Sequence, residues 1–203
     1  MKTTFLTIAT IFTLALGTAT STFANGSKSN DNEASTVLTN VSKINKIELH
    51  GNVELYVSDG NADQVKVYNK YYSESALVQS QNGTLRISSY TDKKLVVWVT
   101  ANDLQTIVAN DNSQIKSFGS LQKLDIEVTL NNTATADLNL DAYNAKIKVN
   151  DRAKANIRGT VNDYSLVQDQ SATVNHSNLA ATNRSKTITN KFVKADVSEL
   201  ANL

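Results

Sequence analysis

Five polar residues, spaced by 18 to 22 positions, four of them with side-chain oxygens, could gather on one edge of a fold. They are Asp111, Asn132, Asp151, Asp169 and Lys191. Carboxylate and amide oxygens are the ligands of Ca²⁺, which takes roughly six to eight of them. The alternative is a solvated row of turn residues, which we favour because the paired Asp-Gly pattern of calcium-binding β-rolls is missing. We therefore expect no metal and no cofactor, and we keep Asp111, Asp151 and Asp169 as candidate binding residues.

The other reactive side chains do not form a recognisable catalytic motif. His50 and His176 are the only histidines, and neither G-x-S-x-G nor H-E-x-x-H occurs. Clustered acids or arginines on one strand face can cleave polysaccharides. The available ones are Asp137, Asp151, Asp169, Arg152, Arg158 and Arg184. Such residues are common on surfaces, so we expect a non-enzymatic protein and keep a polysaccharide lyase or hydrolase as the alternative.

Aromatic residues are concentrated before the middle of the chain, at Tyr68, Tyr71, Tyr72, Tyr90 and Trp98. Aromatic rings beside polar groups can stack on sugars or anchor a protein partner. They can also close the end of a stack of strands, which would otherwise expose its apolar interior. We expect Tyr68 and Trp98 to close such an end, and Tyr71 and Tyr72 to be exposed binding candidates.

The polar row belongs to an octet that recurs along the second half of the chain. Clear copies are Asn131–Leu138, Asn150–Ile157 and Asn190–Val197, and weaker copies start at Asn110 and Gln168. The starting positions are separated by 21, 19, 18 and 22 residues. Places four, six and eight carry small or aliphatic residues, which is the period of a strand. A near-constant step of this length is typical of a stacked solenoid, in which each coil buries its inner face on the next.

Asn opens most copies of the octet, and we expect it to turn the chain. Asn tolerates positive φ and can bond its own backbone, so it replaces Gly at corners. The sequence holds 24 Asn but only 7 Gly. Stacked Asn side chains can also hydrogen-bond from one coil to the next as an amide ladder.

Short alternating segments precede the repeats and predict strands. They are Ile44–Leu49, Val53–Val57, Val65–Tyr68, Thr84–Ser89 and Leu95–Thr100. Turn residues such as His50-Gly51-Asn52 separate them. A turn of helix could form within Tyr72–Ser80 and a C-terminal cap within Val197–Leu203. The expected fold class is all-β, a parallel β-helix-like solenoid with a β-rich N-terminal cap region.

These segments resemble a known family. Ile47–Gly60, Val65–Val67, Gly83–Ile87 and Val96–Val99, followed by coils headed by small polar residues, are similar to the GIN domain, an auto-transporter adhesin head domain of unknown function. The resemblance spans roughly Lys43–Val197. It implies an exported protein, a right-handed β-helix-like fold and a role in adhesion at the cell surface. Asn and Asp stand here where coils of the family usually turn on Gly-Ser-Gly.

The first residues of the chain predict export. Residues 1–24 have a positive start at Lys2, an apolar stretch at Phe5–Leu16 that is too short to span a membrane, and the cleavage pattern Thr22-Phe23-Ala24. Residues 25–42 read as a flexible polar leader, and residues 43–203 as one GIN-like domain. We expect a periplasmic, surface-exposed or secreted bacterial protein without a membrane span in its mature chain.

Composition narrows the expected partners. The 20 basic and 19 acidic side chains nearly cancel, so no electrostatic signal points to nucleic acid. Without Cys, packing and backbone hydrogen bonds must hold the core. A glycan or a cell-envelope protein is the expected partner, and the sequence carries no signal for an oligomeric state.

Overall fold

The protein is all-β. The computed structural model describes residues 35–38, 41, 43–68 and 76–190, which lie within one compact unit, Glu33–Leu203. No helix occurs in these ranges, so none there could cross a membrane. The strands are β1 (Ser35–Leu38), β2 (Lys46–Gly51), β3 (Val53–Ser58), β4 (Gln64–Tyr68), β5 (Ala76–Gln81), β6 (Thr84–Ser89), β7 (Leu95–Thr100), β8 (Thr106–Ala109), β9 (Gln114–Ser117), β10 (Leu121–Leu130), β11 (Thr135–Val149), β12 (Lys154–Asp169), β13 (Thr173–Asn175) and β14 (Leu179–Thr189).

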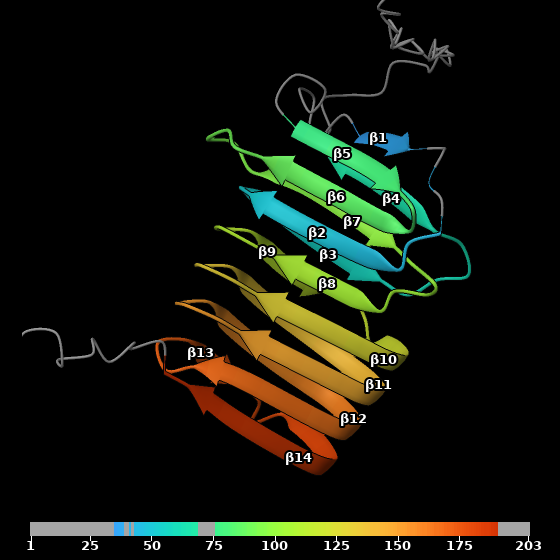
Figure 1. Ribbon diagram of the computed structural model, residues 1–203. Helices are drawn as coiled ribbons and strands as arrows, with labels where there is room; N and C mark the ends of the chain where they lie inside the picture. The colour runs from blue at the N-terminus through green and yellow to red at the C-terminus, as the bar shows by residue number, and fades with distance from the viewer. Residues whose placement is uncertain (1–34, 39–40, 42, 69–75, 191–203) are drawn as a thin grey trace, which may run out of the picture. The chain divides into compact units, whose positions relative to one another are not determined.

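The strands form one sheet that curls and stays open. Its main path runs β1-β4-β7-β3-β9-β11-β10-β8-β2-β6-β5. Strand β11 belongs to both halves of this path, because Thr135–Asp137 pair with β9 while Leu140–Val149 pair with β10. The path therefore turns back at β11 and ends at two separate edges, β1 and β5. In Figure 1 the half that contains β6, β2, β8 and β10 is a row of strands lying side by side.

The repeat controls the pairing of the later strands. Strands β10, β11, β12 and β14 are parallel neighbours, with Leu121 beside Leu140 and Thr135 beside Lys154, each a shift of 19 residues. The predicted inward places are confirmed for the copies that start at Asn131 and Asn150, whereas the copy at Asn190 lies outside the described residues after its first position. The confirmed places are Ala134, Ala136 and Leu138 in one copy and Ala153, Ala155 and Ile157 in the next, all at most 5% exposed. Small side chains suit these places because facing rows of the curled sheet meet there.

We predicted that the first residue of the octet both forms the amide ladder and turns the chain, but these two roles fall to the first and the second residue. The side chain of Asn131 donates to that of Asn110 (Nδ2–Oδ1 2.8 Å) and accepts from that of Asn150 (2.7 Å), which confirms the amide ladder. Positive φ occurs at the second place instead, at 57° in Asn132 and 55° in Asp151. The prediction that the first Asn turns the chain is therefore wrong by one position.

One copy of the octet is also shifted. Gln168 pairs with Val149, and Thr173 pairs with Lys154. The fourth copy therefore begins at Asp169 and not at Gln168, because its register is set by the neighbouring strand.

The N-terminal part departs from a purely parallel arrangement. Strand β4 is antiparallel to both β1 and β7, and β5 is antiparallel to β6. Strand β1 lies within the expected flexible leader, and these four residues are ordered by pairing with β4. Of the segment Tyr72–Ser80, considered for a helical turn, residues 76–80 are extended in β5, and residues 72–75 lie outside the described residues. The expected C-terminal cap, Val197–Leu203, lies outside the described residues. An all-β fold with a curled, open sheet is what this arrangement establishes.

Candidate binding groove

The acidic residues predicted as binding candidates hold the corners of the fold. Asp111 Oδ2 accepts the backbone N–H of Gly51, Asp151 Oδ2 accepts that of Asn132, and Asp169 Oδ2 accepts that of Asp151, each at 2.9 Å. Asp169 is only 4% exposed. These carboxylates satisfy turn donors that strand pairing leaves over. Tyr71 and Tyr72 lie outside the residues that the structure describes.

The residues considered for catalysis do not converge on one site. Arg158 Nη1 pairs with Asp137 Oδ1 at 2.5 Å, whereas Arg184 donates to the carbonyl of Leu179. The first pair lies on the N-terminal portions of β11 and β12, while Arg184 lies on β14. Within the described ranges, no group of three or more His, Asp or Glu side chains is placed to hold a metal ion.

An aromatic pair of one buried and one partly buried residue lies near the last strand. The rings of Tyr164 and His176 are 5.6 Å apart. Burial raises the pKa of Tyr164 to about 12. Burial also lowers the pKa of His176, and the nearby charges of Lys186 and Arg184 add to this effect. Both shifts favour the neutral form of the side chain near pH 7.

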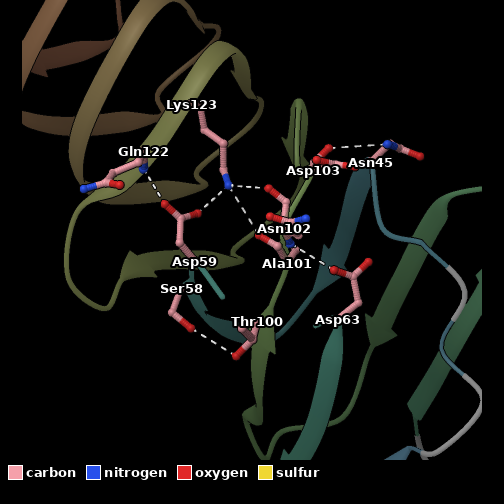
Figure 2. A network of polar contacts seen from close by, with 10 residues as sticks. All are labelled: Asn45, Ser58, Asp59, Asp63, Thr100, Ala101, Asn102, Asp103, Gln122 and Lys123. Atoms are coloured by element: carbon pink, nitrogen blue, oxygen red, sulfur yellow. Dashed lines mark hydrogen bonds and ion pairs between the residues drawn. The ribbon is translucent and has the colours of Figure 1, made fainter. Parts of the chain in front are cut away.

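A polar junction formed by Asp59, Asp63 and Lys123 ties three loops to the start of β10 (Figure 2). The ammonium of Lys123, whose side chain is 6% exposed, pairs with Asp59 and donates to the carbonyl of Asn102 at 2.9 Å. Asp63 accepts the backbone N–H groups of Ile44 (2.5 Å) and Asn102 (2.9 Å). These groups satisfy one another, so the junction has a structural role.

The aromatic cluster lies on the outer face of the sheet and not at its end. The rings of Trp98 and Tyr56 stack at 4.7 Å, with Tyr68 at 6.2 Å and Phe118 at 5.3 Å from Trp98. Trp98 alternates with buried neighbours on β7, and β7 runs between β4 and β3. The prediction that Tyr68 and Trp98 close an open end is therefore wrong. Their faces contact each other, which consolidates three adjacent strands.

The best-formed hollow is a groove of about 580 Å³ that crosses β8, β10, β11, β12 and β14. It runs across the strands, because β10, β11, β12 and β14 each contribute three consecutive residues in register, and Gln105 and Thr106 add the beginning of β8. One wall is the column Asp125, Asn144, Asp163 and Asn183, which are register neighbours. The other wall is the column Thr106, Glu127, Lys146, Ser165 and Ser185. Residues of the intervening column, including Ile126 and Ala145, line the groove between them.

The first wall is held by hydrogen bonds between side chains. Asn144 Nδ2 donates to Asp125 Oδ1, and Asn183 Nδ2 donates to Asp163 Oδ1, both at 2.7 Å. Asn162 Nδ2 donates to the other oxygen of Asp163 at 2.8 Å. The carboxylates and amides are therefore fixed in position along the groove, which lowers the entropy that a ligand would lose on binding to them.

The charge of the second wall is largely neutralised within the protein. Glu127 lies 2.7 Å from Lys148 and 3.7 Å from Lys146. The hydrogen bond from Lys148 lowers the pKa of Glu127, and both lysines favour its charged form. The groove thus offers both hydrogen-bond donors and hydrogen-bond acceptors, and its lining contains charges of both signs.

The groove residues escaped the sequence prediction, although a signal was present. Asp125, Asn144, Asp163 and Asn183 recur at steps of 19, 19 and 20 residues. This is the same period as the octet, but these residues lie outside it. Extending the repeat alignment across whole coils would have brought the column together.

Several solved structures share this fold. A putative adhesin from Bacteroides fragilis is similar with a TM-score of 0.68 and 14% identity, over 79% of this chain and 78% of that one. A putative adhesin from Parabacteroides distasonis is similar with a TM-score of 0.57 and 17% identity, over 78% of this chain and 79% of that one. A putative lipid binding protein from Parabacteroides distasonis has a TM-score of 0.58 and 11% identity, over 78% and 79%. At these identities the likeness concerns the fold alone.

Sequence comparison gives the family directly. No curated protein matched the chain. The family model described as "putative auto-transporter adhesin, head GIN domain" matches residues 43–190. This match covers well over half of the chain and confirms the resemblance seen in the strand segments and coils. The chain therefore belongs to the GIN domain family of auto-transporter adhesin heads.

Proposed function

We propose that this protein is an exported, adhesin-like binding module of the bacterial cell envelope, which uses the groove across β8, β10, β11, β12 and β14 to hold a glycan or an envelope protein. The observation that carries this proposal is the groove itself, about 580 Å³ in volume, with two walls of ordered polar side chains. The description of the family and of similar structures as putative adhesins supports the same role.

The proposal includes export and the coil geometry. Residues 1–24 would act as a signal peptide, and the mature chain would reside in the periplasm, on the cell surface or in the medium. The parallel pairing of β10, β11, β12 and β14, with register shifts of 19 to 20 residues, supports winding of the repeats as a β-solenoid, for which the family resemblance implies a right-handed coil. Such a scaffold displays one outer column of side chains for every outward-facing position in the coil, which suits the recognition of an extended ligand.

The proposed module has no catalytic role. The carboxylates of Asp151 and Asp169, candidates in the enzyme alternative, accept backbone N–H groups in the turns. Arg158, another candidate, is paired with Asp137. General acid or base catalysis needs a group that can reach the substrate proton, and these groups already serve the corners and one strand face.

Binding to envelope material tests the proposal. The mature chain, residues 25–203, would be labelled and screened against intact bacterial cells, isolated envelope fractions and a glycan panel. We expect saturable binding to at least one of them, and fractionation of cells expressing the full chain should place it outside the cytoplasm. Silence on every surface would contradict the adhesin-like role. Turnover of a polysaccharide that Asp151→Ala or Asp169→Ala abolishes would instead support the enzyme alternative.

A further inference from the structure

We infer that the groove binds a linear, uncharged polysaccharide lying across the strands, with one sugar unit facing each strand. This inference rests on the proposed function, for which it names the class of ligand. Three features of the groove support it: the spacing of its walls, their hydrogen-bonding groups and their charge.

The spacing favours a sugar chain over a peptide. Neighbouring strands of a sheet lie about 4.8 Å apart, so the Asp125–Asn144–Asp163–Asn183 column repeats at this distance along the groove. One pyranose unit of an extended chain has a similar length. An extended peptide instead advances about 3.3 Å per residue and about 6.6 Å per same-side pair. A peptide would therefore lose register with the strands after a few residues, whereas a sugar chain would keep it.

The hydrogen-bonding groups match hydroxyls. An amide nitrogen carries two hydrogens, and Asn144 and Asn183 each use one of them to hold the neighbouring carboxylate. The second hydrogen remains for a ligand oxygen. The opposite wall adds the hydroxyls of Ser165 and Ser185, which both donate and accept. A chain with hydroxyls along both edges could bond to both walls at every step.

The charge of the groove favours an uncharged polymer. The lining holds two basic side chains, Lys146 and Arg184, and three acidic ones, Asp125, Glu127 and Asp163. The groove therefore lacks the large excess of one sign that a polyanion or polycation would need.

Chain-length dependence tests this inference. Neutral oligosaccharides of two to eight units, from β-glucan, mannan, xylan and starch series, would be titrated into the mature chain by calorimetry. Since five strands line the groove, we expect the affinity in at least one series to rise about tenfold or more up to roughly five units and then to level off. A flat profile in every series would overturn the inference, as would preference for acidic oligosaccharides or for extended peptides.

A matched pair of variants locates the site. Ser165 and Val167 lie two residues apart on the outer face of β12, and only Ser165 lines the groove. We expect Ser165→Trp to block the groove and weaken oligosaccharide binding at least about tenfold, while Val167→Trp binds as the parent does. Thermal unfolding would establish that both variants are folded. Equal binding by both variants would place the ligand elsewhere and overturn the inference.

The envelope-binding and oligosaccharide-binding assays of the parent protein together separate this inference from the proposed function. If the parent binds envelope material but none of the neutral oligosaccharides, the ligand class is wrong and the adhesin-like role stands. If it binds neither, both fail.

Discussion

We expect Lys123→Met to lower the free energy of unfolding more than the substitution of an exposed lysine does. Met retains the length and apolar character of the stem but removes the ammonium. That ammonium pairs with Asp59 and donates to the carbonyls of Asn102 and Ala101, at 2.9 and 3.3 Å (Figure 2). The Lys123→Met variant leaves these oxygens without their donor in a site where only 27% of the Asp59 side chain is exposed.

The size of the effect follows from this burial. Removing one partner of a fully buried ion pair costs about 3–5 kcal/mol. Because Asp59 keeps some contact with water and still accepts the N–H of Gln122, we expect about 2–3 kcal/mol for Lys123→Met. For a chain of this size that corresponds to a drop in Tm of roughly 5–10 °C. Urea titration and thermal melting, followed by circular dichroism, would measure both quantities.

Two further variants make the measurement specific. Lys148→Met breaks an ion pair with Glu127 in which both side chains are 36% exposed, so its cost should stay below about 1 kcal/mol. Adding Asp59→Asn to Lys123→Met removes the unpaired charge and should restore part of the loss. If Lys123→Met is no more destabilising than Lys148→Met, the ammonium does not stabilise the junction. If Asp59→Asn restores nothing, the loss comes from packing and the electrostatic account is wrong.

Three other predictions concern the repeat and the last strands. Asn131→Asp replaces a donor by an acceptor facing Asn110 and should cost about 1–3 kcal/mol, measured by urea unfolding; an unchanged midpoint would mean that the ladder contributes nothing. Asn132, with φ at 57°, should tolerate Gly better than Ala by about 1 kcal/mol, and the reverse order in paired melts would show that its backbone conformation is not strained. Because the pKa of His176 is lowered on folding, the unfolded chain binds more protons there, so stability should fall as pH drops below about 6.5. His176→Gln should flatten that slope in unfolding curves between pH 5 and 8, and an unchanged slope would assign the pH dependence to other groups.

Local pattern was sufficient for the repeating part of the fold. The octet places Ala134, Ala136 and Leu138 at every second position, and a strand that pairs with identical neighbours must bury such a row. The sequence also indicated the family and the ladder of Asn side chains. Each of these follows from residue type and spacing along one coil, which do not depend on how distant segments meet.

Tertiary structure decided the features that join distant segments. Whether Trp98 closes an end or lies outside depends on which strands flank β7, and the alternation of residues is the same in either case. The turn position moved from Asn131 to Asn132 because the ladder between coils uses the first side chain. Likewise, the groove exists only because register brings Asp125, Asn144, Asp163 and Asn183 into one column. Sequence by itself determined the period and the inward rows, since both are local; the structure alone decided which outward columns face a hollow, because strand order and curvature arise from contacts between residues far apart in the chain.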